Sequence, residues 1–295
     1  MKYLIIGHSV LDHIHYNGKN FIKPGGIFYS ALALLNFKDD DDEIFLNTYI
    51  QNDNYNLFSD VYENFDKKYM MTVERIPKVY LNVHDNKERG ETYENITSKL
   101  EVRLDNLNDF DGILINMITG FDLSLEQLKQ IRKNYNGTIF LDVHTLSRGL
   151  DENFRRNFRL IPQFNEWAES IDILQSNENE IKTLFNLDDE LSIVKEILAC
   201  GVKNFILTKG ENGARIFSLQ KREIISMFVP AIKVEAKNKI GCGDVFGSVF
   251  FYSYIKTKNI GNALKLANIA AGCSVLYDEV NKFKNLKKDV FTRYN

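Results

Sequence analysis

Near the C-terminal end of this 295-residue chain, two glycines, one small residue and an acid stand together as Gly241-Cys242-Gly243-Asp244, and an apolar run follows at once. The run predicts a largely buried helix through Tyr254. A glycine-bearing loop that leads into a helix exposes unpaired backbone N–H groups at the positive end of the helix dipole, a geometry that binds anions such as phosphate. Asp244 falls in the first turn, where the same dipole keeps a carboxylate ionised and able to accept a proton. An anion hole beside a base suits phosphoryl transfer to a hydroxyl, although a plain turn and a helix cap are an alternative interpretation of these residues.

Two further signals lie close to the N-terminus. The stretch from Tyr3 to Gly7 predicts a buried first strand, and Asp12 follows just past its carboxyl end, where open α/β sheets bind ligands. Gly25 and Gly26 then open an apolar helix. They would let the backbone approach a ligand closely, and an ordinary helix start is an equal alternative.

The middle of the chain carries two similar signals. Asn177 and Glu180 follow a strand and open a predicted helix over Glu178–Phe185. The pair could hold the waters around Mg²⁺, and a capping arrangement is an equal alternative. Thr208 and Gly210 end another strand in a glycine-bearing loop, which is compatible with nucleotide phosphates or with a tight turn.

Three other places in the sequence carry residues that could do chemistry. His144 follows Asp142 at a strand end and is either a substrate contact or a satisfied polar contact. His13 and His15 have no evident third partner, which argues against a metal site. Cys242 is either a reactive thiol with a lowered pKa at a helix N-terminus or simply a small residue between glycines.

Alternating strands and helices predict an α/β fold with a mostly parallel sheet covered on both faces. The predicted strands span residues 3–7, 44–50, 112–116, 138–143, 171–175 and 204–208, and the predicted helices span 60–65, 124–133, 164–169, 178–185, 192–199 and 260–276. Residues 214–218 and 223–229 predict an antiparallel hairpin. Shorter β-prone pieces around a polar turn at 85–90 predict a small flap that excludes water from the site. Residues 282–288 predict a solvated tail.

Composition sets bounds on function. Apolar residues are 44% and charged residues 26%, as in ordinary globular proteins. The net charge of −3 argues against a nucleic-acid partner, and no stretch is apolar enough to span a bilayer. Three scattered cysteines and the lack of a signal peptide predict a reducing, cytoplasmic location. Neither a P-loop, nor a dinucleotide-binding fingerprint after the first strand, nor a hydrolase nucleophile elbow is present in the sequence.

In their order and spacing, these features resemble the ribokinase-like (PfkB) carbohydrate kinase family over nearly the whole chain. The shared features are Asp12, Gly25-Gly26, the β flap, Asn177-x-x-Glu180, Thr208-x-Gly210 and Gly241-Cys242-Gly243-Asp244. The resemblance implies one three-layer α/β/α domain over residues 1–295, with a β lid from about 9–24 and 73–104. It also implies ATP- and Mg²⁺-dependent phosphorylation of a hydroxyl on a sugar, polyol or nucleoside. Strands of such a lid can pair between subunits, and a homodimer through the lid is one prediction from it.

The resemblance also implies roles for individual residues. Asp244 would be the general base, and the amides of Gly241, Cys242 and Gly243 would stabilise charge on the transferring phosphoryl group. The implied nucleotide contacts are Thr208, Gly210, Lys239 and Asn268. The implied substrate contacts are Asp12, Gly25, Gly26, Ser30 and His144. The implied holders of Mg²⁺, through water, are Asn177 and Glu180.

The chain departs from the family pattern in two places. Asn238-Lys239-Ile240 stands where the family often has Asp-Thr-Thr, which removes the acid and hydroxyls of a monovalent-cation site. Lys239 could supply positive charge near the phosphates instead, and a solvated loop lysine is an equal alternative. Ser30 stands where ribokinase-type members carry Asn, so the sequence does not single out ribose. Because residues 238–240 differ from the family pattern, there is an alternative function: a catalytically weakened relative that binds a sugar or nucleotide as a sensor.

Overall fold

The protein is built on a nine-stranded central sheet. In the computed structural model, which describes residues 1–16, 18–84, 87–152 and 155–294, this sheet has the order β15-β14-β13-β12-β9-β8-β1-β4-β5. The strands are β1 Lys2–Ile6, β4 Glu43–Ile50, β5 Met70–Thr72, β8 Gly112–Asn116, β9 Thr138–Asp142, β12 Ile173–Asn177, β13 Asn204–Thr208, β14 Gly213–Gln220 and β15 Glu223–Pro230. Neighbours from β13 to β5 are parallel, whereas β13, β14 and β15 pair antiparallel. The sheet is therefore mostly parallel, as the sequence predicts, and the predicted hairpin forms its edge.

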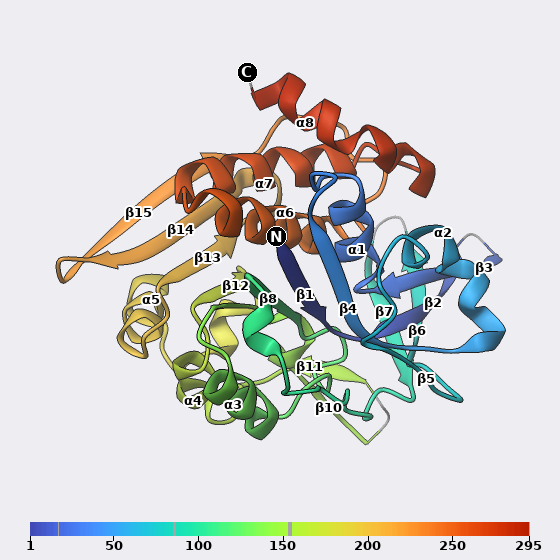
Figure 1. The fold of residues 1–295 in the computed structure, drawn as a ribbon, viewed down its shortest axis with the longest axis horizontal. Helices are drawn as coiled ribbons and strands as arrows, with labels where there is room; N and C mark the ends of the chain where they lie inside the picture. Colours follow the sequence, from blue (N-terminus) through green and yellow to red (C-terminus); the bar gives the residue numbers. More distant parts are fainter. Residues whose placement is uncertain (17, 85–86, 153–154, 295) are drawn as a thin grey trace.

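Helices cover both faces of this sheet. The helices are α1 Phe28–Leu35, α2 Ser59–Tyr62, α3 Leu125–Asn134, α4 Phe164–Glu169, α5 Glu190–Ala199, α6 Cys242–Thr257, α7 Ile260–Ser274 and α8 Leu286–Tyr294. Figure 1 shows α1, α6, α7 and α8 along one face and α3, α4 and α5 along the other. Strand β8 is buried at every position, which is why it reads as a continuous apolar run. Within the described residues, no helix is long and apolar enough to cross a membrane.

A smaller sheet forms the lid (the strands β2, β3, β6 and β7), which lies beside one end of the central sheet (Figure 1). Its strands are β2 Ser9–Tyr16, β3 Lys19–Gly26, β6 Lys78–His84 and β7 Lys87–Glu94, in the order β3-β2-β6-β7. Strands β2 and β6 are parallel, and the other two pairs are antiparallel. The predicted polar turn at 85–90 falls partly on residues 85 and 86, which lie outside the described residues.

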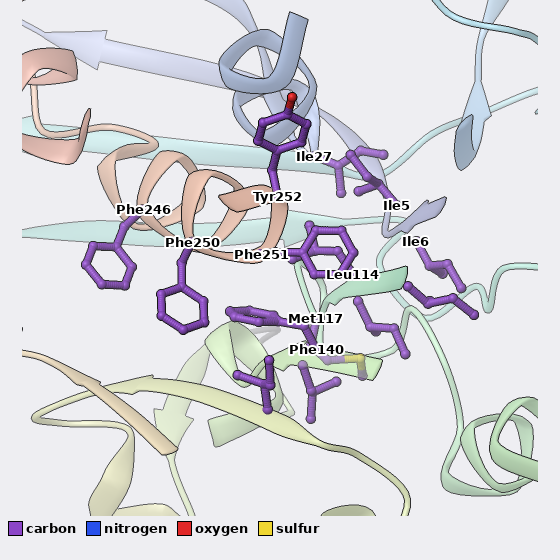
Figure 2. Packing of buried hydrophobic residues seen from close by; sticks show 14 of the residues in the cluster. Ile5, Ile6, Ile27, Leu114, Met117, Phe140, Phe246, Phe250, Phe251 and Tyr252 are labelled. Carbon is purple, nitrogen blue, oxygen red and sulfur yellow. The ribbon is translucent and has the colours of Figure 1, made fainter. Parts of the chain in front are cut away.

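Aromatic packing fixes α6 against the sheet. The Phe251 ring lies edge-on to the rings of Tyr3 and Phe140, with centroid distances of 5.8 and 6.1 Å. Figure 2 shows Phe250 and Phe251 of α6 directed toward Phe140. A Cβ on Gly112 would come within 2.8 Å of the Phe251 ring, so this strand position needs glycine for the helix to pack closely. The N-terminus of α6 is thereby held at a fixed place relative to the strand ends.

Three predicted segments differ from the structure. Residues 178–185 do not form an α-helix, because Asn177 and Glu180 close a turn with the backbone and only Ile181–Thr183 follows as a 3-10 turn. The predicted solvated tail at 282–288 is also wrong, since the 3-10 turn Val280–Asn285 leads directly into α8. Phe283, Leu286 and Val290 are buried and are spaced to form one apolar stripe. The lysines around them made this segment appear solvated in the sequence. Helix α2 ends at Tyr62, three residues earlier than predicted.

Candidate active site

A cleft of about 440 Å³ lies where the lid meets the carboxyl ends of β8, β9, β12 and β13 and the N-terminus of α6. All but two of the predicted site residues line it. They are Asp12, Gly26, His144, Asn177, Glu180, Thr208, Gly210, Lys239, Gly241, Cys242, Gly243, Asp244 and Asn268. The sequence signals at separate strand ends therefore converge, as expected for a parallel sheet whose strands end at one edge.

The start of α6 combines backbone amides with a buried acid. Gly241 precedes the helix with a φ of 75°, in the left-handed region that favours glycine. Asp244 lies in the first turn and is only 9% exposed. The Nδ2 of Asn116, at the end of β8, donates a hydrogen bond of 3.1 Å to Oδ1 of Asp244. The carboxylate is thus oriented from the sheet side, next to the first amides of the helix.

Burial, not the helix dipole, dominates the protonation of this acid. Burial, followed by the negative charges of Asp12 and Glu180, raises the pKa of Asp244 to about 7, against a backbone hydrogen bond that lowers it. The expectation that the dipole alone keeps Asp244 ionised is therefore wrong. A carboxyl group with a pKa near neutrality is matched to general-base work, because it is free to take a proton and strong enough to hold it.

We expect a pH dependence that follows from this pKa. The base must be deprotonated to act, so kcat/KM should level off above about pH 7 and fall about tenfold per pH unit below it. Steady-state kinetics between about pH 5 and 8.5, in buffers of constant ionic strength, measure this limb. A flat profile down to about pH 5 would contradict the assignment of Asp244 as the titrating group.

Two more buried acids share the cleft. Burial, followed by the charges of Glu180 and Asp244, raises the pKa of Asp142 well above its usual range. Burial raises the pKa of Glu180 to about 7, against lowering by its hydrogen bonds with Asn177 and by the charge of Arg148. Acids gathered at this density favour a bound cation or protonation, because like charges in a buried site oppose ionisation.

Asn177 and Glu180 form a reciprocal cap. Oδ1 of Asn177 accepts from the amides of Asn179 and Glu180 at 2.9 and 3.0 Å, and Oε2 of Glu180 accepts from the amide of Asn177 at 2.9 Å. The capping alternative thus describes the local geometry, while both residues still line the cleft. Within the ranges that the structure describes, no group of three or more His, Cys, Asp or Glu side chains is arranged to hold a metal ion directly.

The predicted nucleotide contacts also line the cleft. The Thr208 hydroxyl donates to the carbonyl of Ser176 at 3.3 Å, and Gly210 has a φ of 51° at the start of the following turn. The Nδ2 of Asn268, on α7, donates to the carbonyl of Pro230 at 2.7 Å. Lys239 is exposed beside the amides of the anion hole.

Gly25 and Ser30 do not line the cleft, but each supports a residue that does. A Cβ on Gly25 would lie 2.3 Å from Oδ2 of Asp12, so glycine leaves the space that this carboxylate fills. Ser30 is fully buried, and its Oγ accepts a hydrogen bond of 2.8 Å from the same Nδ2 of Asn116 that reaches Asp244. The structure therefore places Ser30 behind the predicted base.

His144 and Cys242 both face the cleft. The Nδ1 of His144 lies 2.6 Å from the Oγ1 of Thr145, and the residue has a φ of 40°. Burial, followed by the charge of Asp244, raises the pKa of the Cys242 thiol. The interpretation of Cys242 as a reactive thiolate is therefore wrong, and its small size is what the position uses.

Sequence reasoning missed three side chains of the site. Asn116 is the last residue of β8, a strand-end position like the one that identified Asp12, whereas Gln175 lies in the middle of β12. The Nε2 of Gln175 donates to Oδ2 of Asp142 at 3.0 Å and to the carbonyl of Gly243 at 3.3 Å, so it links the acids to α6. Tyr29, on α1, was not predicted as a site residue because an aromatic residue in an apolar helix is usually part of the hydrophobic core.

Comparisons with known proteins agree with this fold. The family model described as pfkB family carbohydrate kinase matches residues 126–285, more than half of the chain. The chain belongs to this family of carbohydrate kinases, which are phosphotransferases with an alcohol group as acceptor. It is 33% identical over 114 residues to a ribokinase of Bacillus subtilis, covering 39% of this chain and 36% of that one. It is 30% identical over 116 residues to a ribokinase of Arabidopsis thaliana, covering 38% and 30%. The matches therefore span about a third of the length of these relatives.

Solved structures match over nearly the whole chain. The Arabidopsis thaliana ribokinase complexed with ribose and ATP gives a TM-score of 0.76 at 16% identity, covering 100% of this chain and 98% of that one. The ribokinase of Thermotoga maritima gives 0.73 at 20% identity, covering 99% and 98%. A pyrophosphate-dependent kinase of the ribokinase family, complexed with a pyrophosphate analogue and myo-inositol, gives 0.72 at 16% identity, covering 93% and 95%. At these identities the likeness establishes the ribokinase-like fold with its lid.

Proposed function

We propose that this protein transfers the γ-phosphoryl group of ATP to a hydroxyl of a small sugar, polyol or nucleoside. The observation that carries the proposal is the buried Asp244 beside the amides of Gly241–Gly243, in one cleft with Asp12 of the lid. The acceptor would lie under the lid near Asp12, and the donor would lie along Thr208, Lys239 and Asn268.

Each residue has a defined part in this reaction. Asp12 would accept a hydrogen bond from one hydroxyl of the acceptor and fix its orientation. Asp244 would take the proton of the reacting hydroxyl as the new O–P bond forms and the bond between phosphorus and the ADP oxygen breaks. The amides of Gly241, Cys242 and Gly243 would stabilise the negative charge on the phosphoryl oxygens in flight.

The residues present fit Mg²⁺. Asn177 and Glu180 offer amide and carboxylate oxygens, the donors that Mg²⁺ takes, and this ion keeps several of its waters when bound. A site in which waters bridge the ion to the protein does not require three protein ligands. The ion would neutralise charge on the donor phosphates when bound. It would also relieve the crowding of Asp142, Glu180 and Asp244.

Release of ADP from ATP and Mg²⁺ tests the proposal, with D-ribose, myo-inositol and a set of nucleosides as acceptors. Acceptor-dependent ADP release supports a kinase. Parallel reactions with pyrophosphate in place of ATP decide the donor, because one matched structure is a pyrophosphate-dependent kinase. If no acceptor supports turnover with either donor while ATP still raises the melting temperature, the kinase proposal fails and the binding sensor motivated by Asn238-Lys239-Ile240 takes its place.

A further inference from the structure

Tyr29 lies at the junction between the lid and the anion hole. It is the second residue of α1, directly after the chain leaves the lid, and its side chain lines the cleft. A Cβ built on Gly241 would lie 2.3, 2.6 and 2.7 Å from Cγ, Cδ1 and Cδ2 of Tyr29. The ring therefore lies flat against the backbone of the first residue of the anion hole.

The hydroxyl of Tyr29 has a different environment from the ring. The residue is only 7% exposed, and none of the side-chain hydrogen bonds described for this structure involves its hydroxyl. Burial, followed by the charges of Asp12 and Asp244, raises the pKa of this phenol. The hydroxyl therefore stays protonated at neutral pH and is available as a donor within the field of both carboxylates.

A sugar, polyol or nucleoside bound between the two acids would also need a hydrogen-bond donor from the protein. Ionised carboxylates only accept hydrogen bonds, so Asp12 and Asp244 can use the hydrogens of the hydroxyls of the acceptor but not their lone pairs. The Nδ1 of His144 is already paired with the Oγ1 of Thr145 at 2.6 Å. Tyr29 supplies a neutral O–H that faces the same space as the two acids.

We propose that Tyr29 is a specificity-determining residue, whose hydroxyl donates a hydrogen bond to an oxygen of the acceptor molecule bound between Asp12 and Asp244. This inference rests on the proposed function. The Tyr29 hydroxyl would favour substrates that have an oxygen able to accept a hydrogen bond next to the hydroxyl that is phosphorylated. The ring has a separate role, because it supports Gly241 whether or not the hydroxyl is present.

The test compares Tyr29→Phe with the unchanged enzyme. The assay uses the member of the D-ribose, myo-inositol and nucleoside panel that the unchanged enzyme turns over fastest. Loss of one neutral hydrogen bond to the acceptor should raise KM for that compound about 5- to 10-fold, with KM for ATP and the melting temperature nearly unchanged. The matched control is Tyr254→Phe on α6, whose ring is stacked on Phe250 and lies outside the cleft. It should leave every constant as it is.

A second variant separates the ring from the hydroxyl. Tyr29→Ala should lower kcat as well, since Gly241 loses its support, whereas Tyr29→Phe should retain kcat within about threefold. If the unchanged enzyme is active and Tyr29→Phe leaves the acceptor KM within about twofold, the inference is wrong while the kinase proposal stands. Equal increases in KM for ATP and acceptor, or a lower melting temperature of Tyr29→Phe, would mean a structural role and also overturn it. If the unchanged protein turns over no member of the panel, both the kinase proposal and the role proposed for Tyr29 are wrong.

Discussion

Asp244→Asn is expected to lower kcat about a thousandfold, the middle of the range for removal of a general base. The asparagine has nearly the same shape and can still contact Asn116, so the cleft keeps its form while the proton acceptor is lost. Affinity for ATP should change little, because the side chain faces the acceptor hydroxyl in the proposed reaction. Steady-state ADP release and a separate ATP titration by calorimetry measure the two effects.

The matched control for this variant is Asp60→Asn. Asp60 is an exposed acid in the first turn of α2. Asp60→Asn therefore removes the same charge from the same kind of helix position, but outside the cleft. It should retain full activity. If Asp244→Asn keeps more than about a tenth of the rate, Asp244 is not the base, and proton transfer must use another group or solvent.

Gly241→Ala is expected to produce the second largest effect, a loss in kcat of about a hundredfold or more, comparable to removing one donor from an oxyanion hole. An alanine at a φ of 75° is strained, and its Cβ would lie 2.3 Å from the Tyr29 ring. The backbone must shift to relieve this contact, and the amides of Cys242 and Gly243 shift with it. The same strain should lower the free energy of unfolding by about 2 kcal/mol.

Gly261→Ala is the control for Gly241→Ala. Gly261 lies in the first turn of a helix, α7, and a Cβ there meets its nearest neighbour at 3.5 Å, an ordinary contact. Its activity and its urea unfolding curve should match those of the unchanged protein. An unchanged kcat in Gly241→Ala would show that the amides do not need this backbone conformation to stabilise the phosphoryl group.

The parallel sheet could be predicted from the sequence because its strands are buried on both faces. Segments such as 112–116 and 204–208 are short apolar runs, and the structure gives β8 and β13 the same bounds. Segments stabilised by contacts between distant parts of the chain were harder to predict. The stripe of Phe283, Leu286 and Val290 in the C-terminal segment lies among lysines, so its burial against the core is clear only in the structure.

The same contrast holds at the candidate site. Asp244 and the glycines could be found because they stand near a strand end or a helix start. Asp12 could be found because it follows the predicted first strand, although the structure places it within β2 of the lid. The pKa of Asp244 could not be predicted, since it depends on burial by the fold and on the charges of Asp12 and Glu180, which are distant in sequence. Tyr29 and Asn116 were missed for a related reason, because only the fold brings α1 and β8 to the start of α6.

In the proposed reaction, the placement of Asp12 on β2, in the lid, would couple the position of the lid to the basicity of Asp244. Asp244 belongs to the central body, and the charge of Asp12 is the second largest cause of its raised pKa. Outward movement of the lid would separate the two carboxylates and leave Asp244 a weaker proton acceptor. Inward movement over a bound acceptor would make Asp244 a stronger proton acceptor when the proton is to be removed, so acceptor binding and basicity would rise together in the proposed reaction.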